Sequence, residues 1–140
     1  MNLKQTVDYY IKSSWHSIAR MYNQAASENE LSQTIGYVLI NVPKEGVPAT
    51  QIAPLMGMEP TSLSRLLKTM EDNGLIYRQK DLIDKRVVKI FLTEKGIEKR
   101  KISKKIILDF NAKVEKNIPA EKLECFVSVL QQICELTKKD

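Results

Sequence analysis

The 140-residue sequence has few of the residues that build metal centres and disulfide frameworks, with two cysteines and one histidine. Cys125 and Cys134 occupy one segment of helical character, where their spacing separates them by about 13 Å, too far for a disulfide bond. No further cysteine or histidine lies near either residue, and His16 has no second ligand. We therefore predict no metal and no cofactor, and we interpret both cysteines as small buried hydrophobic residues.

Long apolar runs are also missing from the sequence. No segment approaches the roughly 20 apolar residues that span a bilayer, and the start MNLKQTVDYY lacks the apolar core of a secretory signal. We therefore expect no membrane association and a cytoplasmic location. The single histidine, the scattered carboxylates and the lack of a glycine-rich phosphate loop argue against an enzyme.

Positive charge is concentrated in the middle of the chain. Overall, 22 Lys and Arg face 17 Asp and Glu, but residues 61–105 alone hold thirteen basic and six acidic side chains. The segments on either side each carry a net charge of −1. Because the whole excess lies in one third of the chain, we predict a surface that binds a polyanion, with nucleic acid as the partner.

Hydrophobic periodicity predicts four helices before the first strand. Residues 3–26 form a long amphipathic helix whose apolar stripe is broken at Ser14, and residues 31–42 form a second helix that ends at Pro43. A short third helix over 49–57 has Thr50 as its expected N-cap and Pro54 near its first turn. The fourth begins at Pro60 and stops at Gly74, so the last two form a helix-turn-helix.

A β-hairpin and two further helices are predicted after Gly74. The strands LIYRQK (75–80) and RVVKIFL (86–92) flank a loop, whereas KEGVP (44–48) is expected to be loop only. Alternation in the second strand places Val88, Ile90 and Leu92 on one apolar face that can dock on the helices. Thr93 caps a helix that runs to about Ile118, and the last helix starts near Pro119 or Ala120 with a nearly heptad apolar seam.

These elements predict a mainly α fold with a helix-turn-helix, a small β-hairpin and a helical dimerisation region. Three long amphipathic segments, one N-terminal and two C-terminal, are too extended for a monomer of this size to cover. We therefore expect a homodimer. Within one intertwined unit, residues 1–30 form the N-terminal dimerisation helix, residues 31–96 the DNA-binding region and residues 97–140 the C-terminal dimerisation helices.

The fourth helix has a polar face suited to the DNA major groove. Its apolar stripe leaves hydroxyl and cationic side chains on the other side: Thr61, Ser62, Ser64, Arg65 and Lys68, followed by Asp72. Arginine can donate two hydrogen bonds to a guanine edge, while hydroxyls and helix N–H groups hold phosphates. An ordinary solvated helix has the same pattern, so the face alone does not decide between the two interpretations.

The loop of the hairpin carries two bases, Lys85 and Arg86, and two acids, Asp81 and Asp84. A compact ribbon can take the bases into a minor groove or along a phosphate track. We expect the acids to orient the bases, because a carboxylate beside a guanidinium fixes its direction. The alternative is a polar turn of no further significance.

These features together resemble the MarR family of winged helix-turn-helix transcription regulators. The specific part covers residues 49–96: the helix pair, NGLIYR (73–78), D-x-x-D-K-R (81–86) and L-T-x-x-G (92–96). The resemblance implies a homodimeric regulator, in most members a repressor, that binds a pseudo-palindromic double-stranded DNA operator. It assigns recognition-helix contacts to Thr61, Ser62, Ser64, Arg65 and Lys68, a minor-groove contact to Arg86 with Asp84 as its orienting partner, and phosphate contacts or salt bridges to Lys85 and Arg78. Leu82, where the family often has proline, and Pro54 depart from the pattern.

Family resemblance also implies a crevice for a small aromatic or lipophilic effector. Tyr10, Trp15, His16 and Tyr37, with Tyr9 and Tyr22, could line it, although core packing and dimer contacts explain these residues better. Some relatives sense oxidants through a cysteine in the N-terminal helix, which this chain lacks. The run KRKISKK (99–105) extends the positive field or is the solvated face of its helix.

One alternative function is left open by the sequence. A winged helix can also act as a protein-interaction module, whose basic surface meets an acidic partner. Salt-sensitive binding to random duplex DNA would separate the two hypotheses.

Overall fold

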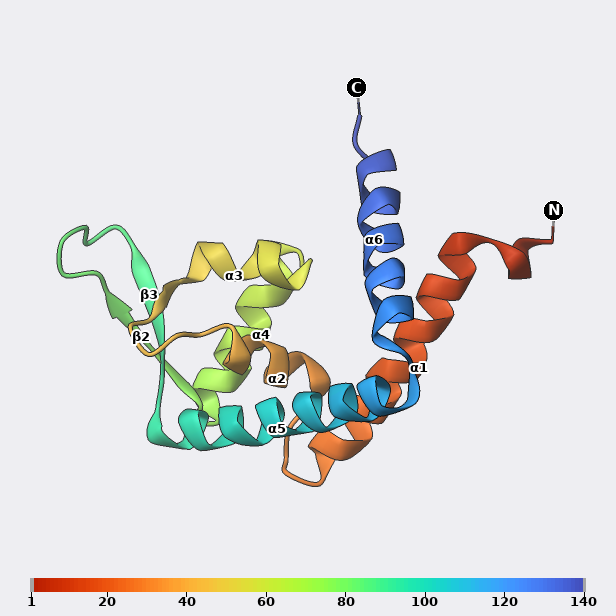
Figure 1. The fold of residues 1–140 in the computed structure, drawn as a ribbon. Coiled ribbons are helices and arrows are strands. Elements are labelled where there is room, and N and C mark those ends of the chain that lie inside the picture. The colour runs from red at the N-terminus through yellow and green to blue at the C-terminus, as the bar shows by residue number, and fades with distance from the viewer. Residues whose placement is uncertain (1, 140) are drawn as a thin grey trace. The chain divides into compact units, whose positions relative to one another are not determined.

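A computed structural model describes residues 2–139 (Figure 1). The elements, in chain order, are a 3₁₀ turn at Leu3–Gln5, α1 (Val7–Ser27), α2 (Gln33–Ile40), β1 (Val47–Pro48), α3 (Ala49–Met56), α4 (Pro60–Asp72), β2 (Ile76–Lys80), β3 (Val88–Leu92), α5 (Glu94–Asn117) and α6 (Ala120–Leu136). They divide into two compact units, Met1–Ile106 and Ile107–Asp140. This confirms the predicted mainly α winged helix-turn-helix. The predicted boundaries at residues 30 and 96 divide the chain by role and stay a prediction.

The N-terminal helix begins later than the periodicity predicts. Thr6 has an extended backbone, and its hydroxyl accepts a hydrogen bond from the Tyr9 N–H at 3.4 Å, so α1 starts at Val7. Leu3 belongs to a separate 3₁₀ turn. Side-chain capping therefore overrides the apolar stripe at this end. The second helix is likewise shorter than predicted, because Ser32 caps it through the Ile35 N–H at 3.1 Å.

The prediction of Thr50 as an N-cap is wrong. Pro48 occupies the cap position of α3 without a side-chain hydrogen bond, and Thr50 is the second residue inside the helix. Pairing of β1 keeps the chain extended up to Pro48, so the helix begins directly after the strand. Pro54 consequently lies in the last half of α3 and not near its first turn. Gly57 ends the helix as predicted, in the left-handed conformation at φ 60°.

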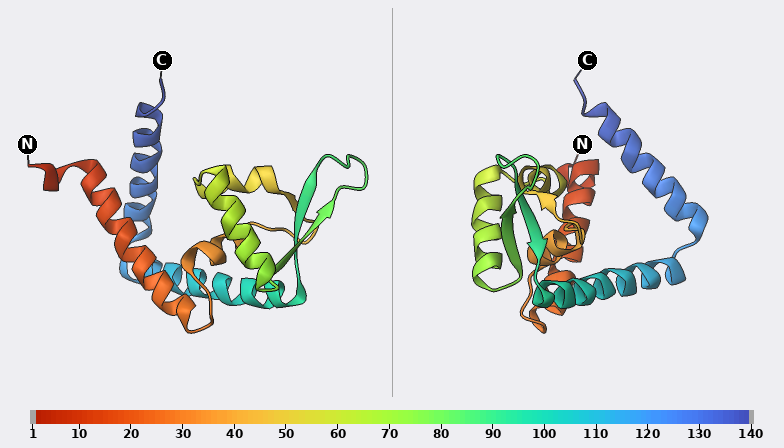
Figure 2. Two further views of the ribbon diagram at one scale, coloured as in Figure 1. Left: turned by 180° about the vertical axis from the view of Figure 1, so that it is seen from behind. Right: turned by 90° about the vertical axis from the view of Figure 1, so that its left-hand side faces the viewer.

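The sheet has three antiparallel strands in the order β1-β3-β2, where a two-stranded hairpin was predicted (Figure 2). The missed strand, Val47–Pro48, pairs with Ile90 and Lys89 of β3. Two residues are too few to produce a periodic pattern, and their extended conformation depends on partners more than 40 residues away. Gly46 precedes them at φ 82°, and a Cβ there would lie 2.6 Å from the Phe91 ring.

Only part of the β3 face docks on the helices. Ile90 is fully buried, but Leu92 is half-buried and Val88 is exposed, so the prediction of a wholly docked apolar face is wrong at the Val88 end. Beyond Ile90 the hairpin extends past the helices towards its loop (Figure 1). On the other face, Tyr77 stacks on Phe91 with ring centroids 5.4 Å apart.

One hydrophobic core holds the first unit together. Its fully buried large side chains come from α2, the loop after it, α3, α4, β2 and β3: Val38, Leu39, Val42, Ile52, Leu67, Met70, Ile76 and Ile90. Each helix contributes the residues of its apolar stripe and each strand one inward residue. The exposed face of α4 is therefore held in place by the burial of its opposite face.

Hydrogen bonds join the end of α4 to the start of α5. Gly74, at φ 73°, and Leu75 close α4 by donating to the Glu71 and Met70 carbonyls at 3.0 and 2.9 Å. The Thr93 hydroxyl then donates to the Gly74 carbonyl at 2.6 Å, and the Thr93 N–H donates to the Leu75 carbonyl at 3.1 Å. We call this set of bonds the Thr93 clasp.

The same hydroxyl caps α5, as predicted, by accepting from the Gly96 N–H at 3.0 Å. A Cβ on Gly96 would collide with the Leu75 carbonyl oxygen, which explains the glycine in L-T-x-x-G.

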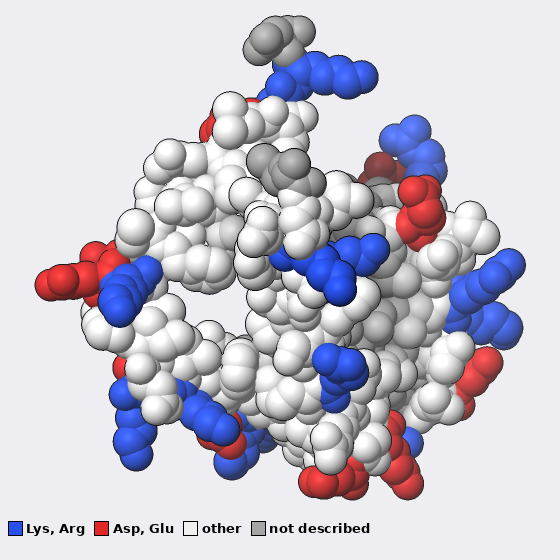
Figure 3. Space-filling model, turned by 90° about the vertical axis from the view of Figure 1, so that its right-hand side faces the viewer, with Lys and Arg blue, Asp and Glu red and all other residues white. Residues whose placement is uncertain are grey.

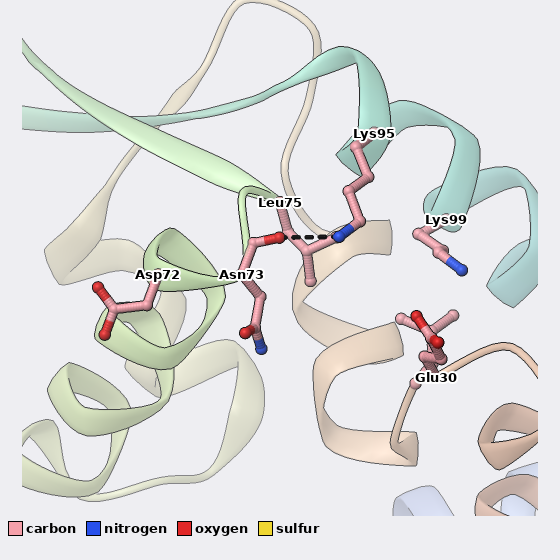
Figure 4. A pocket seen from close by; sticks show the side chains of 7 residues that line it. Glu30, Asp72, Asn73, Leu75, Lys95 and Lys99 are labelled. Atoms are coloured by element: carbon pink, nitrogen blue, oxygen red, sulfur yellow. Dashed lines mark hydrogen bonds between the residues drawn. The ribbon is translucent and has the colours of Figure 1, made fainter.

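Two lysines of α5 satisfy carbonyl groups at other helix ends. Both lysines line a polar pocket, where Figure 4 shows the hydrogen bond of Lys95. Lys95 Nζ donates to the Asn73 carbonyl at 3.0 Å, and Lys99 Nζ donates to the Asn29 carbonyl at 2.7 Å. Both carbonyls follow the last turn of a helix, where cations are favourable. Nearby, a Cβ on Gly36 would lie 3.0 Å from the hydroxyl oxygen of Ser103, so α2 and α5 approach closely.

The C-terminal helix buries none of its residues in the described chain. Cys125 and Cys134 are exposed, so the prediction that they are buried hydrophobic residues is wrong. An apolar seam on a helix indicates burial, but the surface that covers it need not belong to the same chain. None of the helices over residues 2–139 is long and apolar enough to cross a membrane. Across the same residues, no group of three or more His, Cys, Asp or Glu side chains could hold a metal ion.

The Thr93 clasp predicts a difference between two substitutions at one position. Thr93→Val keeps the shape but removes the hydroxyl, which leaves the Gly74 carbonyl and the Gly96 N–H without their partner. We expect the free energy of unfolding to fall by about 1–2 kcal/mol, as measured by urea denaturation. Thr93→Ser keeps the hydroxyl and should lose less than half of that. Equal losses in the two variants would contradict the role of the hydroxyl.

Candidate DNA-binding surface

The predicted recognition residues all lie on the exposed face of α4. Thr61, Ser62, Ser64, Arg65 and Lys68 are exposed, while Leu63, Leu67 and Met70 are buried on the opposite side. The helix starts with Pro60, and its N-cap residue Glu59 makes no side-chain hydrogen bond. The N–H groups of the first turn therefore have no cap from Glu59, next to the hydroxyls of Thr61 and Ser62.

The two cations on this face, Arg65 and Lys68, are available to bind a ligand. Lys68 Nζ lies 3.9 Å from an Asp72 carboxylate oxygen, and both side chains are largely exposed. Such an exposed pair contributes little stability, so phosphate can replace Asp72 at small cost. The Arg65 carbonyl accepts from the Thr69 hydroxyl at 3.1 Å. The exposed Arg65 guanidinium forms no salt bridge with any residue in 2–139.

The wing loop, residues 81–87, is closed by one of its two acids. An Asp81 carboxylate oxygen accepts from the N–H groups of Ile83 and Asp84 at 3.2 and 2.9 Å. Its other oxygen lies 3.3 Å from Lys89 Nζ. The prediction that both acids orient Lys85 and Arg86 is therefore wrong for Asp81, which shapes the turn and pairs with β3. Lys89 was not anticipated, because its partner is identified only when the strands are paired.

The second acid holds the exposed arginine as predicted. Arg86 Nε and Nη2 donate to the two Asp84 carboxylate oxygens at 3.1 and 3.3 Å, and the Arg86 N–H donates to the first of them at 3.1 Å. The Arg86 side chain is 91% exposed. This two-point contact fixes the direction of a guanidinium that otherwise lies in solvent. Lys85 is exposed beside it.

Both wing carboxylates are charged at neutral pH. Hydrogen bonds from the Asp84 N–H first, and from Lys89 and the Ile83 N–H, lower the pKa of Asp81 below its usual value. The Arg86 side chain is the largest cause of the lowered pKa of Asp84. Hydrogen bonds to an ionised carboxylate favour that form. The loop geometry is therefore present above the normal aspartate range and is lost as acid protonates the two groups.

Arg78 lies in β2. The sequence left open whether it contacts phosphate or forms a local salt bridge. Its Nε is 3.7 Å from a Glu71 carboxylate oxygen on α4, which is the local salt bridge.

The run KRKISKK (99–105) in α5 also has a structural role. Lys99 holds the Asn29 carbonyl, and Arg100 Nε is buried with no hydrogen-bond partner among residues 2–139.

The charged groups are not gathered on every face of the protein. On the face in Figure 3, Lys and Arg are interspersed with Asp and Glu, and broad areas are uncharged. The exposed cations of α4 and the wing loop, by contrast, belong to the segment with thirteen bases and six acids.

The predicted effector residues are only partly brought together. Trp15 of α1 and Tyr37 of α2 are in ring contact, with centroids 6.3 Å apart. Tyr10 instead packs edge-on against Tyr9, with centroids 5.7 Å apart. His16 is exposed on α1 beside Tyr9, Lys12, Ser13 and Arg20, while Tyr22 is buried. The effector crevice stays a prediction.

Comparisons with known proteins, by sequence and by structure, both find similarity to MarR-family regulators. Residues 44–88, from the loop before β1 to the first residue of β3, match the MarR family model. The chain is 29% identical over 96 residues to the HTH-type transcriptional regulator TtmR of Methylorubrum extorquens (strain PA1), covering 68% of this chain and 49% of that protein. It therefore spans about half the length of this curated relative.

Two solved structures illustrate the likeness in fold. S. aureus MepR, in a complex with DNA, superimposes with a TM-score of 0.82 at 23% identity over 95% of this chain and 99% of that chain. CouR from Rhodococcus jostii RHA1, bound to p-coumaroyl-CoA, gives 0.81 at 23% identity over 100% and 99%. The family model covers the helix-turn-helix and the wing loop, whereas the structural matches cover at least 95% of this chain. Residues 44–88 are therefore similar to the MarR family, and the chain has the fold of these solved structures.

Proposed function

We propose that this protein is a transcriptional regulator, acting as a repressor, whose homodimer binds a pseudo-palindromic site in double-stranded DNA. Each protomer places α4 in a major groove and the wing loop in the adjacent minor groove. Two recognition helices related by twofold symmetry then enter successive major grooves about 34 Å apart. A cytoplasmic location is part of the proposal, because its partner is chromosomal DNA.

The main observation behind the proposal is that one hydrophobic core holds both α4 and the wing loop with their cations exposed. The exposed row of hydroxyls and cations on α4 is backed by buried Leu63, Leu67 and Met70, and the wing holds Arg86 in a two-point contact with Asp84. Rigidly held donors lose less entropy when they bind base edges and phosphates than mobile ones do. The solved relatives MepR and CouR include DNA complexes, which supports the same partner for this chain.

Exposed apolar side chains support the homodimer. In α6, Phe126 is 55% exposed, Leu136 is 85% exposed, and no residue is buried. In α1, Val7, Ile11 and Trp15 are exposed as well. Two amphipathic helices with uncovered apolar faces are typical of a chain that buries them against a second copy.

A small aromatic or lipophilic effector remains part of the proposal. Trp15 and Tyr37 bring α1 and α2 into ring contact, and the solved CouR structure contains p-coumaroyl-CoA. A ligand that binds one dimer geometry better than another changes the separation of the two α4 helices and so releases DNA.

DNA binding itself is tested by salt and by one arginine. The protein should bind duplex DNA at low ionic strength, with log K falling by about 0.9 per neutralised phosphate as log salt rises. Arg65→Ala should weaken a selected duplex by about 1–3 kcal/mol, because a bidentate base contact is lost. Fluorescence anisotropy measures both effects. Lys122→Ala, which removes a cation from α6, is the matched control. Binding that ignores salt, or retention of an acidic protein but no DNA, would favour the protein-interaction alternative.

The wing is tested by separating charge from orientation. Arg86→Ala should weaken binding about tenfold and remove the preference for A·T pairs at the edges of the site. Asp84→Asn makes the protein more positive but loosens the guanidinium. Simple charge attraction predicts tighter binding for Asp84→Asn, whereas the orienting role predicts weaker binding. Tighter binding in an anisotropy titration would count against the role of Asp84.

Dimerisation is tested on α6. Phe126→Glu should turn the homodimer into a monomer at micromolar concentration, because the charge would be buried in the interface without a partner. Gln132→Glu adds the same charge on the side of the helix away from the apolar seam and should leave the dimer intact. Analytical ultracentrifugation reports both masses, and equal effects of the two variants would contradict the assigned face.

A further inference from the structure

The tip of the wing loop presents two large apolar side chains to solvent. Leu82 is 89% exposed and Ile83 is 96% exposed, which are the highest values among the exposed large hydrophobic residues of the described chain. They are neighbours in the loop between β2 and β3, and this hairpin projects from the helices (Figure 1). Scattered exposed leucines are ordinary on a protein surface, but an adjacent pair at a projecting tip is not.

This exposure is built into the loop by its hydrogen bonds. Asp81 accepts from the N–H groups of Ile83 and Asp84, its own N–H donates to the Val87 carbonyl at 2.9 Å, and the Val87 N–H donates to the Asp84 carbonyl at 3.0 Å. The Asp81 carboxylate also pairs with Lys89. The turn therefore holds Leu82 and Ile83 outward in one conformation, so little conformational entropy is lost when they contact a partner.

Charge on the loop is sorted between its two sides. The acids are half-buried, with their carboxylates satisfied by the loop backbone, Lys89 and Arg86, whereas Leu82, Ile83, Lys85 and Arg86 are exposed. The outward surface is thus an apolar pair followed by two cations. It fits a partner whose apolar surface is set back from a rim of negative charge.

The minor groove of duplex DNA has that chemistry. Phosphates line its rims, while deoxyribose walls and the edges of stacked bases form its interior. Proteins that insert branched aliphatic side chains there partly unstack one base step and bend the duplex. Lys85 remains at a rim, while Arg86 makes the minor-groove contact already proposed. The apolar pair is thus continuous with the DNA-binding surface already described.

We propose that Leu82 and Ile83 form an apolar wedge, which enters the minor groove beside Arg86 and partly unstacks one base step. This inference rests on the proposed function and adds a second way of selecting sequence. Pyrimidine–purine steps such as TA unstack most easily, so the DNA under the wing is chosen for its deformability. Leu82 and Ile83 make no base-specific hydrogen bond in this scheme.

The test compares two double variants of the full-length protein. A duplex is first selected with the unmodified protein from a pool containing 30 randomised base pairs, and 2-aminopurine is placed at the step under the wing. Leu82→Ser/Ile83→Ser should bind this duplex at least about tenfold more weakly, with the same salt slope, because apolar contact but no charge is lost. Leu82→Ile/Ile83→Leu retains the apolar volume and should bind like the unmodified protein. Both variants should melt at the unmodified temperature, since the two side chains are exposed.

Fluorescence and step replacement report the unstacking itself. The 2-aminopurine signal should rise with the unmodified protein and with Leu82→Ile/Ile83→Leu, but not with the serine variant. Replacing a TA step under the wing by AA should weaken the unmodified protein more than the serine variant. Arg86→Ala, by contrast, should reduce the salt slope.

Each adverse result has a distinct meaning. Equal affinity of the serine variant, or weaker binding with no fluorescence change for the unmodified protein, overturns the wedge and leaves the proposed function standing. If the unmodified protein binds vesicles of phosphatidylcholine and phosphatidylglycerol, and the serine variant loses that binding but keeps its DNA affinity, the wedge is overturned in favour of a membrane contact. Failure of the unmodified protein to bind any duplex at low salt overturns the proposed function and the wedge together.

Discussion

The Thr93 clasp is the constraint on which the geometry of the DNA-binding surface depends. One hydroxyl donates to the carbonyl of Gly74, which ends α4, and accepts from the N–H of Gly96, which begins α5. The Leu75 carbonyl, reached by the Thr93 N–H, leaves no space for a side chain on Gly96. Because both strands of the wing start or end at this point, the clasp sets the position of the wing relative to α4. The motifs NGLIYR and L-T-x-x-G are two halves of one structural junction.

The two acids of the wing loop are neutralised by partners within the loop and its strands. Asp81 and Asp84 lower the net charge of a surface that is proposed to meet DNA, yet each carboxylate is engaged by N–H groups or a cation of the loop and its strands. Their hydrogen bonds define the turn and aim Arg86 outward. The loop can therefore present cations and apolar side chains together, which a flexible loop with the same composition would do only part of the time.

The remaining apolar surface belongs to the long helices. The first compact unit, Met1–Ile106, buries a complete core, whereas α6 buries nothing within the described chain. An amphipathic helix gains stability only when its apolar face is removed from water. The proposed dimer would supply the missing partner surface for α6 and for the outer face of α1. Folding of these helices and assembly of the proposed DNA-binding unit would then be one process.

Local pattern and composition alone were enough to predict the helix pair, the hairpin and the exposed row on α4, because each depends on residues close in sequence. The family resemblance singled out the Asp84–Arg86 contact. Periodicity places Arg65 opposite Leu63 and Leu67, and a two-residue spacing lets Asp84 reach Arg86. Tertiary structure decided what depends on distant partners. The β1 strand forms because β3 lies beside it, Thr50 is not a cap because that pairing extends to Pro48, and Asp81 pairs with Lys89 across the hairpin. Cys125 and Cys134 remain exposed for the same reason, since a helix records an apolar face in its sequence but not the surface that covers it.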